Sequence, residues 1–416
     1  MDHKTKLCAV PWHELYITSN GHYGLCCLED QNFNSQRIGL DQSVDIHWNS
    51  NYMKQARLDF LQGKSLPQCK QCWNDESANK ISGRMRRNLK YYGQAEIYKK
   101  DEAFQRTISE TDITGHTNLP IKGLFFSVGD ICQLRCIDCS PGYSRSILKD
   151  YQKLGWHSNI KNRRFVLKND LMHNPKEHQQ HLWNRVQEIS GKVDWIRVQG
   201  GEPTISPQLL QFLHWYHEQG YAADTTIMIT TNAVNIRQQF LDALKPFHRV
   251  KIEISVDGVG ELDEYLRYPT NWQKKEKIID NLISQFDCNI HSTVYSLSID
   301  GLVDLIKWAE TKSVLHSLQI LNYPDELGIQ HLPDRFKHEL IAELEPYRPI
   351  HDYKLDDNFD HQQYRNNCVQ GIINRLMDCR DEQKWQQAKH TVEAYDGIRR
   401  QQLTQILPRL GTYLQQ

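Results

Sequence analysis

A chain of 416 residues, 39% of them hydrophobic and 24% charged, has the composition of a soluble globular protein and the length of two or three domains. Its 50 basic and 51 acidic residues leave a net charge of -1, which excludes a strong overall field for attracting nucleic acid or an anionic membrane. No apolar stretch has the length of a membrane span, and the start of the chain lacks the features of a secretory signal. We therefore expect a cytoplasmic protein with neither a membrane nor a nucleic acid as partner.

Four regions follow one another along the chain. Residues 1–95 are rich in cysteine and in turn signals, and residues 96–120 are polar and predict a linker with some helix. Residues 121–337 alternate strand-like and helix-like segments. Residues 338–416 predict a mostly helical C-terminal extension.

The third region predicts an α/β fold with a parallel sheet. Six short segments rich in β-branched or aromatic residues are the predicted strands, namely 122–128, 193–198, 225–230, 250–256, 289–296 and 315–321. Amphipathic stretches between them, such as 207–218 and 278–286, are predicted helices. Repeated βα units imply parallel strands with right-handed crossovers. Six units are too few for a closed eight-stranded barrel and suit an open, partial one.

The chain has eleven cysteines, an odd number, and most of them are clustered. Clustering of this kind is untypical of a disulfide framework and typical of metal binding in a reducing compartment. The eight early cysteines are Cys8, Cys26, Cys27, Cys69, Cys72, Cys132, Cys136 and Cys139. Eight thiols are enough for two metal sites.

Cys132, Cys136 and Cys139 follow directly after the first predicted strand of the βα series. Three thiolates this close on one loop can hold three irons of a four-iron cluster and leave the fourth iron open to a chelating ligand. Three buried or zinc-bound thiols are the alternative.

Cys8, Cys26, Cys69 and Cys72 can supply a second site. From spacing alone, both a tetrahedral zinc site and an iron–sulfur cluster remain open, and so does the choice between Cys26 and Cys27 as a ligand.

The Cys-x3-Cys-x2-Cys motif and its surroundings resemble the radical S-adenosylmethionine (SAM) superfamily, whose partial (βα)6 barrel carries this motif after its first strand. Matching segments occur in order: Gly200-Gly201-Glu202-Pro203 after the second strand, Thr230-Thr231-Asn232 at the end of the third, and Ser255-Val256-Asp257-Gly258 at the end of the fourth. The resemblance implies a four-iron cluster on the three cysteines and a SAM site formed by Gly200, Gly201, Glu202, Asn232, Ser255 and Arg267. Glu202 would bind the amino group of SAM, and Arg267 its carboxylate.

One position departs from the family pattern. The residue before the third cysteine is often aromatic in the family, where it stacks near the adenine, but here it is Asp138.

The N-terminal region resembles the SPASM/twitch auxiliary-cluster module, placed before the barrel instead of after it. Companion segments are Trp48-Asn49-Ser50 and Ser82 to Asn88. The resemblance implies one auxiliary iron–sulfur cluster, of four or two irons, on Cys8, Cys26, Cys69 and Cys72, with family spacing favouring Cys26 over Cys27. A cluster with four protein thiolates has no open iron, so electron transfer is its expected role.

Strand parity indicates which side chains face the barrel interior. If Ser255 faces SAM, then Glu253 and Lys251 share its face, and Arg197 lies two residues before Gln199 on the second strand. Charged residues at such positions either pair internally or contact substrate, so Glu253, Lys251 and Arg197 are candidate catalytic residues.

A basic run, Arg84-Met85-Arg86-Arg87, lies in the N-terminal region. Salt bridges to the barrel or a solvated helix face are favoured over binding of an acidic substrate.

The resemblance implies an enzyme that reductively cleaves SAM to a 5′-deoxyadenosyl radical, which abstracts hydrogen from a peptide or protein substrate. A flavodoxin or ferredoxin would be the electron donor. Radical modification of a small metabolite or nucleotide-like compound is an alternative within the enzyme class. A zinc-stabilised binding module on a decayed barrel is the alternative outside it.

Overall fold

The computed structural model describes residues 6–18, 21–29, 38–77, 81–93, 101–156, 175–349 and 361–415. Of the predicted linker, residues 96–100 lie outside the described residues, and α6 (Glu102–Ser109) supplies its helix.

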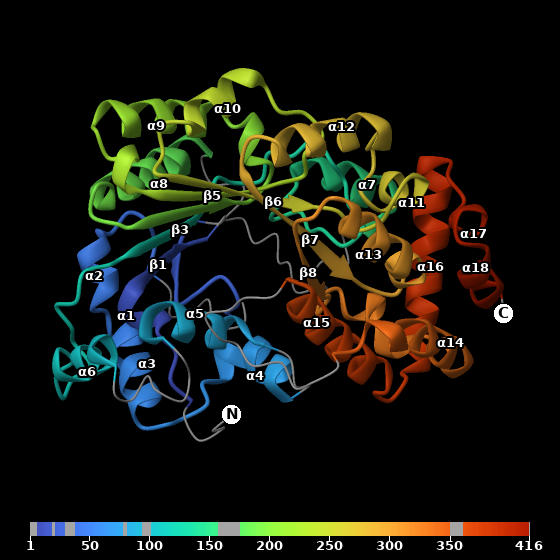
Figure 1. The fold of residues 1–416 in the computed structure, drawn as a ribbon, viewed down its shortest axis with the longest axis horizontal. Helices are drawn as coiled ribbons and strands as arrows, with labels where there is room; N and C mark the ends of the chain where they lie inside the picture. The colour runs from blue at the N-terminus through green and yellow to red at the C-terminus, as the bar shows by residue number, and fades with distance from the viewer. Residues whose placement is uncertain are drawn as a thin grey trace.

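One open sheet of eight strands organises the chain (Figure 1). The strands are β1 (Glu14–Ile17), β2 (Tyr23–Gly24), β3 (Gly123–Ser127), β4 (Trp195–Gln199), β5 (Thr226–Thr231), β6 (Arg249–Ser255), β7 (Asp287–Val294) and β8 (Leu315–Ile320). Strands β3 to β8 pair in parallel with their neighbours in chain order. The six predicted strands and the open partial barrel are therefore confirmed, with ends that shift by a few residues.

Strands β1 and β2 were not predicted from the sequence. Strand β1 adds in parallel to the edge of β3, with Glu14 opposite Gly123, and β2 pairs with β1 in the antiparallel direction. The strand Glu14–Ile17 has only four residues and follows directly on the short helix α1 (Val10–His13), so its sequence shows no period. The N-terminal region thus shares a sheet with the barrel.

The helices of the barrel cover the outer face of the sheet (Figure 1). They are α7 (Leu148–Lys153), α8 (Pro175–Ile189), α9 (Pro207–Glu218), α10 (Gln238–Leu244), α11 (Glu261–Leu266), α12 (Trp272–Ile283) and α13 (Leu302–Thr311). Alternate strand residues such as Ile196, Val198 and Ile227 are fully buried beneath them, as the period of two requires. The other face of each strand is left for the barrel interior.

The two predicted barrel helices exist, but only one has the predicted bounds. Helix α9 matches its predicted range, and Ser206 caps its start by accepting a hydrogen bond from the Leu209 amide, 3.2 Å away. Helix α12 starts at Trp272 rather than 278, because Asn271 caps it through the amide of Lys274.

Helices of the two terminal regions lie on the inner side and beyond β8 (Figure 1). The N-terminal ones are α2 (Val44–Trp48), α3 (Asn51–Leu61), α4 (Lys70–Ser77) and α5 (Gly83–Tyr92). The C-terminal ones are α14 (Asp334–Leu344), α15 (His361–Leu376), α16 (Glu382–Arg399), α17 (Leu403–Ile406) and α18 (Pro408–Leu414), which confirm the expected helical extension.

Contacts between these two regions bridge the open side of the barrel, between β2 and β8. The Arg86 guanidinium on α5 donates to the Tyr364 hydroxyl on α15 at 2.7 Å. The backbone amide of Ile81 donates to the side chain of Asn367 at 3.3 Å.

A buried ionic cluster joins α16 to the cysteine loop. The Asp150 carboxylate on α7 pairs with Arg399 at 2.9 Å and with Arg135, between Cys132 and Cys136, at 2.5 Å. Arg399 also donates to the Arg135 carbonyl at 2.5 Å. The C-terminal extension therefore helps to fix the position of the loop.

We predict that Arg399→Met lowers the free energy of unfolding by about 3 kcal/mol or more, because it removes a charge-assisted partner from a buried carboxylate. Arg249→Met is the matched control: its ion pair with Asp287 is largely exposed, and its loss should cost less than about 1 kcal/mol. Urea denaturation followed by circular dichroism measures both. Equal losses in the two variants would contradict the role assigned to Arg399.

Candidate active site

The three-cysteine loop leaves the C-terminal end of β3 and folds across the barrel mouth. Its backbone is held by the end of α11 and the segment after it: the amide of Ile137 donates to the Leu266 carbonyl at 3.0 Å, and that of Arg135 to the Tyr268 carbonyl at 2.6 Å. The Cys132 thiol lies 3.7 Å from the Asn232 side-chain nitrogen at the end of β5. The loop is therefore bound on two sides by residues that follow other strands.

The chemistry of these thiols fits a metal cluster. Burial raises the pKa values of Cys132, Cys136 and Cys139, and the neighbouring thiols and Asp138 add to the effect at Cys139. Buried thiolates that repel one another need a nearby cation to ionise. Iron supplies that charge in a cluster. The positive charge of Arg267 offsets part of the rise in the pKa of Cys132 and Cys136.

Gly200 and Gly201 permit the β4 turn to approach the cysteine loop closely. Both have positive φ, 85° and 53°. A β-carbon on Gly201 would lie 2.4 Å from the Ile131 carbonyl oxygen, and one on Gly200 would lie 1.7 Å from the Ser127 hydroxyl. Both positions therefore exclude other residues, and the amide of Glu202 donates to the Ile131 carbonyl at 2.8 Å.

The Glu202 carboxylate is buried and accepts from four protein donors. One oxygen accepts from the Thr204 amide and hydroxyl, at 3.2 and 2.7 Å, and from the Thr231 hydroxyl at 2.7 Å. The other oxygen accepts from the Asn232 amide at 2.7 Å. Glu202 thus orients Asn232 toward Cys132, and its predicted contact with the amino group of SAM would be added to this arrangement.

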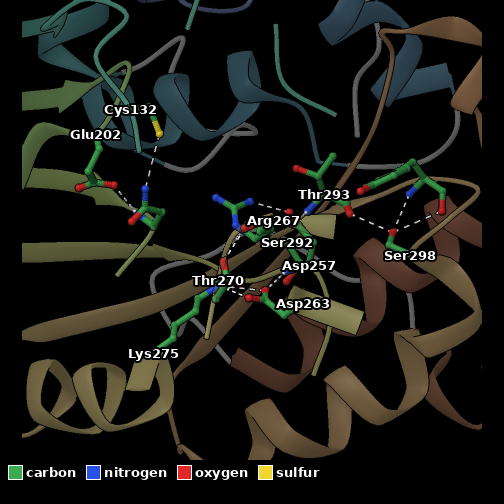
Figure 2. A network of polar contacts seen from close by, with 12 residues as sticks. Cys132, Glu202, Asp257, Asp263, Arg267, Thr270, Lys275, Ser292, Thr293 and Ser298 are labelled. Atoms are coloured by element: carbon green, nitrogen blue, oxygen red, sulfur yellow. Dashed lines mark hydrogen bonds and ion pairs between the residues drawn. The ribbon is translucent and has the colours of Figure 1, made fainter. Parts of the chain in front are cut away.

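Arg267 pairs with Asp257 beside the cysteine loop (Figure 2). The separation is 2.5 Å, and the second oxygen of Asp257 accepts from the Thr293 amide at 2.7 Å. The Nε of Arg267 is buried and has no hydrogen-bond partner among the residues that the structure describes. That donor is available to a carboxylate, as the predicted role of Arg267 requires.

A second, fully buried ion pair supports the first. Lys275 donates to both oxygens of Asp263, at 2.9 and 2.8 Å, and both side chains are buried completely (Figure 2). Asp263 also accepts from the Asp257 amide at 3.4 Å. This pair was not predicted from the sequence: Asp263 and Lys275 lie twelve residues apart on two different helices, α11 and α12, and no local pattern joins them.

Asp138 lies among these charges. Burial, and then repulsion by Asp257, raises the pKa of Asp138 to about 7. One of its carboxyl oxygens is buried without a hydrogen-bond partner in the described part of the chain. A carboxyl group therefore occupies the position where an aromatic ring is expected.

Of the three candidate catalytic residues, two come together. Arg197 on β4 pairs with Glu253 on β6 at 2.5 Å, and the Thr230 hydroxyl donates to the same carboxylate oxygen at 2.9 Å. Burial raises the pKa of Glu253, but Arg197 and then His291 outweigh it and lower the value to about 2. Lys251 lies apart, 3.7 Å from Asp287 and 35% exposed.

Five cysteines line one cavity in the N-terminal region: Cys8, Cys26, Cys27, Cys69 and Cys72. Within the described residues, no three His, Cys, Asp or Glu side chains are arranged closely enough to hold a metal ion. Burial raises the pKa of Cys8 to about 12 and that of Cys72 to about 11, and the positive charge of Arg84 opposes both shifts.

The surroundings of Cys26 and Cys27 differ. The Cys26 thiol is repelled by Cys27, Cys69, Cys72 and Cys8. Burial raises the pKa of the Cys27 thiol, and the positive charges of Arg87 and Arg197 oppose that shift. This contrast supports Cys26 as the ligand, which stays a prediction.

The basic run is mostly ion-paired, as favoured from the sequence. Arg84 pairs with Glu76 on α4 at 2.8 Å, and Arg87 pairs with Glu14 on β1 at 3.5 Å. Both arginines line the cysteine cavity.

Residues 8–73 match the family model of the iron–sulfur cluster-binding SPASM domain. This segment is a SPASM domain. The match includes all four predicted auxiliary ligands, and the predicted module is confirmed. Together with the open (βα)6 sheet and its cysteine loop, the SPASM domain supports a radical SAM protein with an iron–sulfur module.

No curated protein sequence matches the chain significantly. Among solved structures, SuiB of Streptococcus suis bound to S-adenosylmethionine is similar, with a TM-score of 0.36 and 13% identity over 61% of this chain and 49% of that one. The chain thus spans about half the length of that SuiB chain. Coproporphyrinogen III oxidase (HemN) of Escherichia coli, a radical SAM enzyme, has a TM-score of 0.33 and 15% identity over 61% and 52%.

None of the described helices is both long and apolar enough for a membrane crossing.

We predict that Arg267→Met raises the Kd for SAM about tenfold or more, because a carboxylate loses a charge-assisted donor. Equilibrium dialysis of anaerobically reconstituted protein measures this. The substitution also leaves Asp257 buried and unpaired, so the double variant Asp257→Asn/Arg267→Met is the control. We expect it to recover stability but not SAM affinity; a recovered affinity would show that Arg267 acts only through folding.

Proposed function

We propose that the protein is a radical SAM enzyme that binds a four-iron cluster on Cys132, Cys136 and Cys139 and SAM beside it. The observation that carries the proposal is that the segments after four strands meet at one place. The cysteine loop follows β3, and Glu202, after β4, donates its amide to the Ile131 carbonyl of that loop. Asn232 and Arg267 approach the three cysteines from the segments after β5 and β6. Ligands of open α/β folds bind at this edge of the sheet.

The protein residues would bind and orient SAM. Asn232, fixed by Glu202, lies next to the Cys132 thiol, and the Nε of Arg267 is an unpaired donor among the described residues. When bound, the cluster supplies the electron that cleaves SAM to methionine and a 5′-deoxyadenosyl radical. The enclosing barrel excludes water from the radical.

A peptide or protein is the proposed substrate class. It is the class implied by the resemblance. The substrate would not bind to the auxiliary cluster, because four cysteine ligands leave no open coordination position there. SuiB, one of the similar structures, binds the precursor peptide SuiA.

The proposed role of the SPASM domain is electron transfer. Its cysteine cavity is also lined by Phe125 of β3, so the auxiliary cluster would lie against the barrel wall. A small electron-transfer protein such as a flavodoxin or ferredoxin is the proposed reductant. Because all these thiols must stay reduced, we place the protein in a reducing compartment such as the cytoplasm.

We predict that anaerobically reconstituted protein holds about eight irons, the content of two four-iron clusters. Replacing Cys132, Cys136 and Cys139 together by alanine should remove about half of the iron and abolish SAM cleavage. Iron and sulfide analysis and detection of 5′-deoxyadenosine measure both. Zinc without sulfide in the native chain would refute the proposal, and a total near six irons would indicate a two-iron auxiliary cluster.

We predict that Cys69→Ala leaves substrate-free SAM cleavage largely intact and prevents turnover of substrate. The reason is that the auxiliary site has no place for SAM but is needed for electron transfer. Circular dichroism must first show an intact fold, since cluster loss can unfold a module. The matched control is Cys379→Ala, an exposed cysteine outside both sites, which should behave as the wild type. Full turnover by a folded Cys69→Ala protein would exclude the electron-transfer role.

A further inference from the structure

Helix α5 begins at Gly83, beyond the segment 8–73 that matches the SPASM family model. Its N-terminal half nevertheless lies at the cysteine cavity, which Gly83, Arg84 and Arg87 line. The cysteines of that cavity come from three separate stretches of the chain, and the start of α5 lies against each of them.

Asn88 of α5 fixes the peptide groups on both sides of Cys8. Its side-chain Oδ1 accepts a hydrogen bond from the Ala9 amide at 2.8 Å, and its Nδ2 donates to the Leu7 carbonyl at 2.9 Å. Asn88 is only 5% exposed, so water cannot replace these bonds if the side chain is removed. The backbone that carries the Cys8 thiol is therefore tied to α5.

Arg84 joins the same stretch to α4, the helix that carries Cys72. Its Nη1 donates to the Leu7 carbonyl at 2.6 Å. Its Nε and Nη2 donate to the two carboxylate oxygens of Glu76 on α4, at 2.9 and 2.8 Å. This bidentate pair fixes the plane of the guanidinium group, which also lies over the ring of Trp73, 5.2 Å from its centre. Arg84 thus bridges the N-terminal stretch and α4.

The first turn of α5 lies against the other two stretches. The hydroxyl of Ser82, at the N-cap of α5, donates to Glu76 at 2.7 Å. A β-carbon on Gly83 would lie 2.5 Å from a methyl carbon of Leu28, the residue after the double cysteine, and 3.8 Å from the sulfur of Cys72. The start of α5 is therefore packed between the stretches that supply the other cysteines.

We propose that α5 is part of the auxiliary cluster site, and that Arg84 and Asn88 are positioning residues that hold Cys8 in place relative to Cys72. The inference rests on the proposed ligation of the cluster by these cysteines. Ionised thiols repel one another, so an unsupported site would have to be assembled at the moment the cluster binds. Side chains that bridge the ligand-bearing stretches reduce the ordering that cluster binding must supply.

Iron release from the auxiliary cluster tests the proposal. The parent protein is the full chain with Cys132, Cys136 and Cys139 replaced by alanine, so that bound iron reports the auxiliary site alone. The anaerobically reconstituted protein is mixed with a ferrous chelator, and iron release is followed by absorbance. We expect Asn88→Leu and Arg84→Lys each to release iron at least about tenfold faster than the parent, because loss of a group that orients a ligand typically weakens metal binding about 10- to 100-fold.

Arg84→Lys separates position from charge. Lysine keeps the positive charge, but its single ammonium group cannot pair with both oxygens of Glu76 and also reach the Leu7 carbonyl. This exposed-charge-neutral change also carries the test if Asn88→Leu fails to fold.

A matched asparagine separates a positioning role from a general loss of stability. The Asn49 side chain also bonds to backbone on both sides, since it accepts from the Thr117 amide and donates to the Thr117 carbonyl, each at 3.1 Å. It also accepts from the buried Arg57 at 2.9 Å. Asn49→Leu should therefore lower the unfolding temperature of the iron-free chain at least as much as Asn88→Leu does, yet leave the rate of iron release unchanged.

Release from Asn88→Leu and Arg84→Lys at the parent rate overturns the role of α5. Equally fast release from Asn49→Leu overturns it too, because release would then follow general stability. The proposed function is scored on the parent itself: if the parent holds no iron and sulfide, the auxiliary cluster falls and the role of α5 falls with it. An intact cluster that all variants release at one rate removes only the role of α5.

Discussion

Charges enclosed by the open barrel have to be compensated where they lie, because the surrounding sheet and helices exclude the water that would otherwise screen them. The structure meets this requirement with pairs arranged along the strand ends. Lys275 neutralises Asp263, Asp263 orients the backbone of Asp257, and Asp257 holds Arg267 beside the cysteine loop. Each pair fixes the next, so the position of Arg267 depends on a lysine of the following helix, α12.

The same requirement explains the two cysteine sites. Burial raises the pKa of every thiol in both sites, so their thiolates are unfavourable until a cation lies among them. Nearby arginines supply part of that charge: Arg84 and Arg87 at the SPASM cavity, and Arg267 at the barrel loop. An iron–sulfur cluster completes the compensation, and we expect cluster binding to stabilise the surrounding fold.

The sequence predicted those features of the fold and the site that local residue patterns determine. The six barrel strands and α9 follow from period-two and amphipathic patterns, and the glycines at 200 and 201 from a turn after a strand. Strand parity placed Arg197 and Glu253 on inward positions, but it could not show that they pair with each other, because that depends on the stagger of β4 against β6. The pairs of Asp150 with Arg399 and of Arg86 with Tyr364 join residues more than 240 positions apart, and no local signal indicates them.

The place of the N-terminal region in the fold follows from the edges of a partial barrel. Six parallel strands leave the edge of β3 with unpaired backbone groups, and an open edge is prone to pair with other chains. Strand β1 covers that edge, while Arg86 of α5 reaches Tyr364 on α15, and Ile81, just before α5, reaches Asn367 on the same helix. A region that precedes the barrel in sequence therefore completes its wall. Since Glu14, Tyr16 and Phe125 line both the cysteine cavity and this wall, packed side chains, and not a linker alone, connect the SPASM cysteines with the barrel.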